Sequence, residues 1–451
     1  MTKRANFGSK LGVILATAGS AVGLGNVWRF PFMTGQNGGA AFILVYLFCV
    51  VMLGIPFMIS EFIVGRHGAA NTARAYSKLA GGGFFSVVGY LGVLTGFLIF
   101  GYYIIVCGWT LFYLLASVVN DVKGTPEQVT EYFMRFSSDP IKPIGWTIGF
   151  MLLVHFVIAR GVQKGIEKSS KAMMPLLFIL LLVIVVASCM LPGAMKGVEF
   201  LFKPDFGKLD SDVFLNAMGQ AFYSLSIGMG CICTYASYFS RQTNLPRSAI
   251  EVSLIDAVVA ILAGLMIFPA AFSVGVNPDS GPSLIFITLP NVFQQAFASV
   301  PIVGYVVAIF FYALLSVAAL TSAISLHEVS TAFFSEELHI GRNSAAWIVT
   351  CCCSVIAIFC SLSLGKQDWL IIGGRPLFDW FDYITGQIFL PIVGLLTALF
   401  VGWYMPHKIV RDEYTNWGTL KGTTFKAYLF CVKYVCVVSI AVIFLHQMGI
   451  L

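Results

Sequence analysis

The sequence predicts an all-α protein that crosses a membrane eleven times, arranged as two inverted repeats of five spans plus one added span. Three observations support this fold class. Of the 451 residues, 58% are hydrophobic and only 11% are charged, whereas soluble domains carry charges at roughly a quarter of their positions. Apolar segments of membrane length recur along the chain, and glycines interrupt two of them. This composition excludes an ordinary soluble domain.

Each predicted span is an apolar stretch long enough to cross a hydrocarbon core of about 30 Å, which takes about 20 helical residues. The stretches lie at 11–35, 40–64, 86–118, 144–159, 172–192, 213–238, 249–275, 302–335, 344–363, 380–404 and 424–447. We expect one transmembrane domain over residues 1–451. Its first repeat covers about 11–192, its second about 213–404, and the eleventh span about 424–447.

The distribution of lysine and arginine predicts the orientation. Most of those outside the spans lie in the N-terminal tail and the even-numbered loops, which the positive-inside rule places in the cytoplasm. We therefore expect a cytoplasmic N-terminus and an extracytoplasmic C-terminus in a cell inner (plasma) membrane, and no nucleic-acid partner. The first span lacks the features of a cleaved signal peptide. All eleven cysteines lie in spans, which favours packing over disulfides.

Two spans carry glycines where a regular helix is expected, at 22–25 in span 1 and at 226–230 in span 6. In hydrocarbon a helix break survives only where it lines a protein cavity. The breaks lie five spans apart, an odd number, which predicts an inverted repeat with a binding site between its halves. Close helix packing through small residues explains Gly228 and Gly230 about as well as a helix break does. The two glycines lie only two residues apart, however, which favours unwinding.

Polar side chains within spans mark candidate functional residues, because a charge at mid-bilayer costs at least about 2.5–3.5 kcal/mol. Asp256 offers oxygen ligands of the kind that hard cations prefer; a carboxylate at a helix end near the cytosol is the alternative. Arg29 and Asp382 lie at the outer ends of spans 1 and 10, where they could form a structural ion pair or a gate. The hydroxyls of Thr321 and Ser322 either bond to their own helix or complete a cation site.

Several motifs resemble the neurotransmitter:sodium symporters, in particular their bacterial amino-acid transporters for leucine, tryptophan and other hydrophobic amino acids. The motifs are GSAVGLGNVWRFP at 19–31, GIP at 54–56 with Glu61 and GR at 65–66, YY at 102–103, SLS at 224–226, TYASY at 234–238 and LTS at 320–322. They cover essentially the whole chain in the family's order. The resemblance implies a 5+5 inverted-repeat symporter fold and sodium-coupled uptake of an amino acid by alternating access.

The resemblance also implies two sodium sites and one substrate site. The first sodium would be held by Ala21, Asn26, Ser224 and Asp256. The second would be held by Gly19, Val22, Ala318, Thr321 and Ser322. The substrate would contact Ala21, Leu24, Gly25, Ile99, Tyr103, Tyr223, Ser224, Ser226, Met229, Ser322 and Leu326. Ile99 and Leu326 could equally be packing residues. No organic cofactor is expected.

Further roles follow from the same resemblance. Arg29 with Asp382 would close the outer side, and Arg4 with Glu336 the inner side. Glu61, Gly228 and Gly230 would support the break in span 6. Gly165 and Pro175 are separated by nine residues. In bacterial relatives a similar spacing allows span 5 to unwind toward the second sodium; a simple helix kink is the alternative. Phe7 stands where the family has tryptophan, which weakens the inner-gate assignment.

Two departures from the family pattern predict the substrate and the ion requirement. Monoamine carriers have an aspartate at the position of Gly23, so the substrate here would supply its own carboxylate, which favours an amino acid, hydrophobic or aromatic. Chloride-dependent members have a neutral side chain at the position of Asp256, so we expect chloride-independent transport.

Three other classes of function are alternatives to a symporter: a channel, an enzyme and an amino-acid sensor. A channel would need a continuous polar pore, and an enzyme would need a nucleophile and base or a metal cluster, for which His327-Glu328 is the one tempting pair. We therefore expect no enzymatic activity. An amino-acid sensor, which binds its ligand without transporting it, would keep the same site. This function remains the alternative to a symporter.

Overall fold

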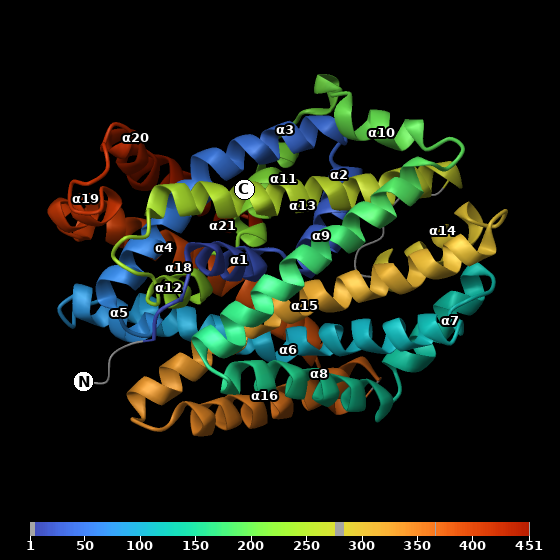
Figure 1. Cartoon of the computed structure of the whole chain (residues 1–451), viewed down its shortest axis with the longest axis horizontal. Helices are drawn as coiled ribbons and strands as arrows, with labels where there is room; N and C mark the ends of the chain where they lie inside the picture. The colour runs from blue at the N-terminus through green and yellow to red at the C-terminus, as the bar shows by residue number, and fades with distance from the viewer. Residues whose placement is uncertain (1–4, 276–283, 366, 451) are drawn as a thin grey trace.

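Long helices run alongside one another through the whole molecule (Figure 1). The computed structural model describes residues 5–275, 284–365 and 367–450. In the first half the helices are α1 (Lys10–Ala21), α2 (Phe30–Gln36), α3 (Ala40–Cys49), α4 (Ile55–Gly68), α5 (Thr72–Leu79), α6 (Ser86–Val118), α7 (Pro126–Ser137), α8 (Lys142–Ala159), α9 (Lys168–Cys189) and α10 (Met195–Phe202). Short π-helical segments precede α2, α4 and α9, at Gly25–Arg29, Val50–Gly54 and Val162–Glu167.

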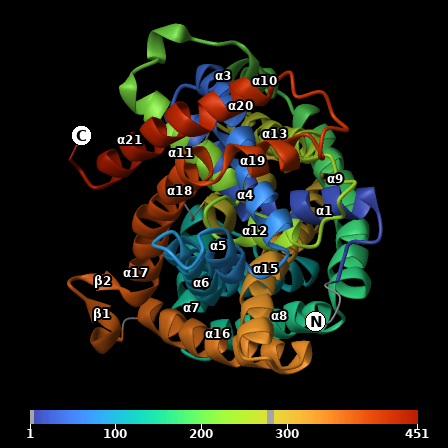
Figure 2. The same ribbon diagram turned by 90° about the vertical axis from the view of Figure 1, so that its left-hand side faces the viewer.

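The second half repeats this pattern of long helices. It contains α11 (Ser211–Ser224), α12 (Cys231–Ala236), α13 (Leu245–Ser273), α14 (Leu289–Ala296), α15 (Pro301–Glu337), α16 (Arg342–Leu364), α17 (Leu377–Tyr383), α18 (Leu390–Leu399), α19 (His407–Tyr414), α20 (Phe425–Phe430) and α21 (Val437–Gln447). One short antiparallel pair, β1 (Ile371–Ile372) with β2 (Arg375–Pro376), precedes α17. Figure 2 shows this hairpin at the edge of the molecule.

The predicted spans coincide with helices, but their number is only partly supported. Within the described ranges nine helices are long and apolar enough to cross a membrane, and a tenth crossing is formed by Lys10–Ala21 with Gly25–Gln36, bent by 54°. The sixth predicted span consists of α11 and α12, and neither helix meets this length and apolarity. Eleven crossings and an inverted repeat therefore stay predictions.

Both predicted breaks lie inside the bundle. Helix α1 packs against α9, α13 and α15, and α12 packs against α4 and α15. Ala21, Val22 and Leu24 are at most 4% exposed. The irregular backbone is thus surrounded by protein, as its polar groups require in a membrane.

Close contact between α4 and α12 depends on a glycine. A Cβ at Gly65 would lie 2.1 Å from the carbonyl oxygen of Cys233 and 2.8 Å from the Cβ of Ala236. A carbon so near a backbone oxygen is a severe overlap, so any side chain at this position would push α12 away from α4. Gly65 therefore positions α12, the second half of the broken span 6.

We predict that Gly65→Ala lowers the free energy of unfolding by about 1–3 kcal/mol, the usual cost of overpacking. The measurement is thermal unfolding of the purified protein in detergent. Gly149→Ala on α8 is the matched control, because nothing lies within 4 Å of its added Cβ. Equal melting temperatures for the two variants would contradict this account of the α4–α12 contact.

Candidate functional site

The break in span 1 is held by a side chain of the following turn. Helix α1 ends at Ala21, and Val22 has extended backbone angles, φ −71° and ψ 106°. The N–H of Gly23 donates to Oδ1 of Asn26 over 3.0 Å, which satisfies a donor that the helix no longer pairs. A Cβ at Gly23 would lie 2.4 Å from Oγ of Ser322. Glycine therefore allows the broken span to approach α15 closely.

The break in span 6 is held in a similar way. Between α11 and α12, Ser226, Gly228 and Gly230 have φ angles of +52°, +83° and +75°, a region that suits glycine and strains serine. The N–H of Gly228 donates to Oε1 of Glu61 over 2.8 Å. The hydroxyl of Ser226 donates to the carbonyl of Ser20 over 2.8 Å. This last bond joins the two broken spans directly.

A first cluster of buried oxygens surrounds Asp256, whose side chain is fully buried. Oγ of Ser224 donates to Oδ2 of Asp256 over 2.7 Å, and the Tyr46 hydroxyl lies 3.3 Å from the same oxygen. Nδ2 of Asn26 lies 2.7 Å from Oδ1 of Asp256 and 3.3 Å from Oγ of Ser224. Carboxylate and hydroxyl oxygens gathered in this way suit a hard cation. The amide of Asn26 would have to turn over to offer its oxygen as a further ligand.

A second cluster lies where α15 meets the end of α1. Oγ1 of Thr321 is 2.9 Å from the carbonyl of Ala318 and 3.4 Å from that of Val22. Oγ of Ser322 is 3.2 Å from the same Val22 carbonyl. Gly19 faces Thr321, since a Cβ on Gly19 would lie 3.3 Å from the Thr321 Cβ. The five residues predicted for a second cation thus lie together, although Thr321 also bonds to its own helix.

A cavity of about 60 Å³ lies between the two breaks. Its lining includes all eleven residues that were predicted to contact a substrate: Ala21, Leu24, Gly25, Ile99, Tyr103, Tyr223, Ser224, Ser226, Met229, Ser322 and Leu326. Sequence reasoning missed Ser20, Tyr102, Ser325, Gly386 and Leu390. Ser325 follows Ser322 by three residues and so shares its helix face, a signal that could have identified it.

The predicted outer gate residues lie in one cavity but have separate partners. Arg29 and Asp382 both line a cavity of about 280 Å³ outside the first one. The guanidinium of Arg29 lies over the Tyr223 ring, 4.3 Å from its centre. Asp382 accepts a hydrogen bond of 3.0 Å from Tyr102. Among the ion pairs of the described residues, none joins Arg29 to Asp382, so this gate is not closed here.

The predicted inner gate is only partly described. Arg4 lies outside the described residues. Glu336 accepts hydrogen bonds from the backbone and side chain of Asn71, at 2.8 and 3.1 Å. Phe7, which replaces the expected tryptophan, packs edge-on against the rings of Tyr235 and Tyr238. These contacts place the start of the chain beside the inner half of span 6.

Span 5 is helical throughout the segment that was predicted to unwind. Gly165 lies in the π-helical segment Val162–Glu167, and Pro175 lies inside α9, which follows without interruption. A Cβ at Gly165 would lie 2.0 Å from the carbonyl oxygen of Val157. In this conformation the glycine serves close packing, and the unwinding of span 5 stays a prediction.

The one pair that raised the possibility of catalysis has structural partners. The His327 ring contacts the hydroxyls of Thr331 and Thr350 at 2.9 and 3.0 Å. Glu328 accepts a bond of 2.6 Å from the Tyr238 hydroxyl and forms a buried ion pair with Arg342. Both side chains are therefore engaged in holding helices together.

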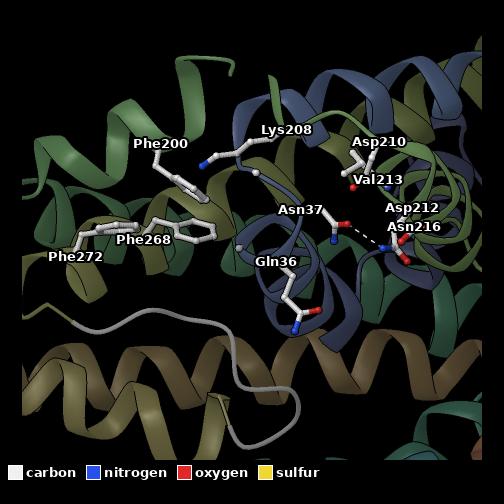
Figure 3. A pocket seen from close by; sticks show the side chains of 12 residues that line it. Gln36, Asn37, Phe200, Lys208, Asp210, Asp212, Val213, Asn216, Phe268 and Phe272 are labelled. Carbon is white, nitrogen blue, oxygen red and sulfur yellow. Dashed lines mark hydrogen bonds between the residues drawn. The ribbon is translucent and has the colours of Figure 1, made fainter. Parts of the chain in front are cut away.

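A larger cavity, of about 850 Å³, lies apart from this site at the ends of α2, α10, α11 and α13 (Figure 3). It shares no lining residue with the cavity between the breaks. In the lining of this cavity, Nδ2 of Asn216 donates a hydrogen bond to Oδ1 of Asn37 over 2.9 Å, drawn as a dashed line in Figure 3. This bond joins the residue that follows α2 to α11.

Comparison with known proteins gives a consistent picture. A model of the "Sodium:neurotransmitter symporter family" matches residues 4–127 and 127–450. An "Uncharacterized sodium-dependent transporter YhdH" of Bacillus subtilis is 36% identical over 100% of this chain and 99% of the relative. The human "Sodium- and chloride-dependent GABA transporter 2" is 26% identical over 96% and 79%.

A solved structure confirms the helical membrane-transporter fold. The crystal structure of MhsT in complex with L-phenylalanine is 39% identical, with a TM-score of 0.88 over 99% of this chain and 100% of that one.

We predict that Asp256→Asn weakens sodium binding at least about tenfold, since a buried cation loses about 1.4 kcal/mol or more with its charged ligand. The measurement is the rise in melting temperature as sodium replaces choline. Ser253→Ala is the control: it lies one turn earlier on α13, and its buried hydroxyl has no partner among the described residues. An unchanged sodium titration for Asp256→Asn would remove Asp256 from the cation site.

Proposed function

Because the chain belongs to the sodium:neurotransmitter symporter family, we propose that it carries an amino acid into the cell together with sodium. The observation that carries this proposal is the position of the cavity between the breaks. Asn26 and Ser224 of the first oxygen cluster and Ser322 of the second all line it. A molecule bound there would touch both cation sites, so its binding energy would depend on sodium.

The lining of this cavity favours a zwitterionic substrate. Its described residues include no charged side chain, so a lone amine would find no counter-ion. The ends of broken helices carry partial charges of both signs: free N–H groups suit a carboxylate, and free carbonyls suit an ammonium or a cation. We assign the N–H groups of Leu24 and Gly25 and the hydroxyl of Tyr103 to the carboxylate. We assign the carbonyls of Ala21, Tyr223 and Ser224, together with Ser226, to the amine.

The remaining residues that line the cavity favour a substrate with an apolar side chain. Ile99, Met229 and Leu326 are each less than a tenth exposed, and methionine adapts its shape to different neighbours. The similar structure of MhsT contains L-phenylalanine. We therefore propose a hydrophobic or aromatic amino acid such as tryptophan, leucine or phenylalanine.

Transport by alternating access requires that each side can close around the bound ligands. We propose Arg29 with Asp382 as the outer gate and Arg4 with Glu336 as the inner gate. Both residues of the outer pair line one cavity, and among the described residues no ion pair joins them, so closure would require α2 to move toward α17. Ligands that bind best in the closed form would then shift the population toward it.

We predict sodium-driven uptake in proteoliposomes that contain the purified protein. A tenfold sodium gradient supplies about 1.4 kcal/mol for each ion, so labelled tryptophan, leucine or phenylalanine should accumulate above its outside concentration. Potassium in place of sodium should abolish accumulation. Binding without accumulation, for every amino acid tested, would favour a sensor over a symporter.

We further predict that uptake does not require chloride. Asp256 is buried within the first oxygen cluster, so it supplies a fixed negative charge beside the cation. Uptake rates in sodium chloride and in sodium gluconate should agree within error. Loss of uptake in gluconate would show that Asp256 does not replace the anion.

A further inference from the structure

A groove of about 430 Å³ lies between the first two turns of α13 and the segment that links α19 to α20. Arg247, Ile250 and Glu251 line it from α13, and Tyr414, Lys421 and Thr424 line it from the other side. Both segments belong to predicted even-numbered loops or to helix ends next to them. With the orientation proposed above, the groove therefore lies at the cytoplasmic surface of the membrane.

The charges around this groove favour an anionic ligand. Lys421 is exposed, and the Arg247 side chain is 65% exposed on the opposite wall. The one acidic residue of the lining, Glu251, already pairs with Arg247 over 2.7 Å and lies 3.8 Å from Nζ of Lys10. Two cations, Arg247 and Lys10, thus lie beside this one carboxylate, and Lys421 adds a third positive charge that is not paired with it.

An apolar column continues from the groove along α13. Ile250, Leu254 and Val258 follow one another at intervals of four residues, on one helix face, and are 51%, 61% and 39% exposed. Helix α13 is one of those long and apolar enough to cross a membrane. The column therefore faces acyl chains, and its cytoplasmic end opens at the basic groove.

We propose that this groove binds an anionic phospholipid of the cytoplasmic leaflet. Its phosphate lies between Lys421 and Arg247, and one acyl chain lies along Ile250, Leu254 and Val258. The continuity of the basic groove with the lipid-facing column favours a lipid over a soluble phosphate, which would use only the groove. Anionic lipids attract basic residues near the membrane surface by about 1 kcal/mol for each residue.

The test is lipid binding to the purified full-length protein, measured by native mass spectrometry with phosphatidylglycerol and phosphatidylcholine of identical chains. The wild type should prefer phosphatidylglycerol. Lys421→Gln should weaken that binding about fivefold, and Lys421→Arg should preserve it. Lys426→Gln is the matched control, because Lys426 is exposed five residues further on but does not line the groove.

Three results would overturn the proposal. These are equal binding of the two lipids by the wild type, equal effects of Lys421→Gln and Lys426→Gln, and displacement of phosphatidylglycerol by inorganic phosphate or glycerol phosphate. The last result would assign the groove to a soluble anion. Since binding is measured without transport, the outcome is independent of whether the protein proves to be a sodium-coupled symporter.

Discussion

Two helix breaks inside the bundle leave backbone groups that must be satisfied by protein atoms. An unpaired N–H or C=O in hydrocarbon costs several kcal/mol. Asn26 accepts from Gly23 in span 1, and Glu61 accepts from Gly228 in span 6. These two bonds satisfy the N–H groups of Gly23 and Gly228, and hydroxyls of other elements reach the carbonyls at the end of α1. Those of Ser20 and Val22 face hydroxyls from α15 and from the break in span 6.

The side chain that stabilises the first break, Asn26, also belongs to the first oxygen cluster. Asn26 accepts from Gly23 through Oδ1 and contacts Asp256 through Nδ2. A buried carboxylate must be paired or hydrogen-bonded, and Asp256 receives bonds from Asn26, Ser224 and Tyr46. If a cation replaced some of these donors, Asn26 would turn, and the hydrogen bond that holds the break would change. Cation binding and the shape of span 1 are therefore linked through one residue.

The sequence was sufficient for features that depend on local pattern and on family motifs. Membrane-length apolar stretches located the helices, and the glycines located both breaks. The motifs, carried over position by position, predicted eleven of the residues that line the cavity between the breaks. Features that depend on competing partners could not be predicted. Arg29 contacts Tyr223 and Asp382 accepts a bond from Tyr102. The spacing of these residues along the sequence does not reveal which partner each charged side chain takes. Gly386 and Leu390 reach the cavity only because α18 and the π-helical segment before it, Ile384–Phe389, pass beside it.

The separate partners of the outer gate have an energetic consequence. Arg29 is only partly buried and Asp382 is exposed, so neither charge has to be paired to offset a large burial cost. The stacking of Arg29 on Tyr223 contributes about 0.5–1 kcal/mol at such a site, and an ion pair between exposed side chains contributes about 0–1 kcal/mol. Closure would therefore exchange contacts of similar strength. Because the two states then differ little in free energy, ligand binding can decide between them. Tyr223 lines both the inner and the outer cavity, so a bound ligand would act on the same ring that holds Arg29.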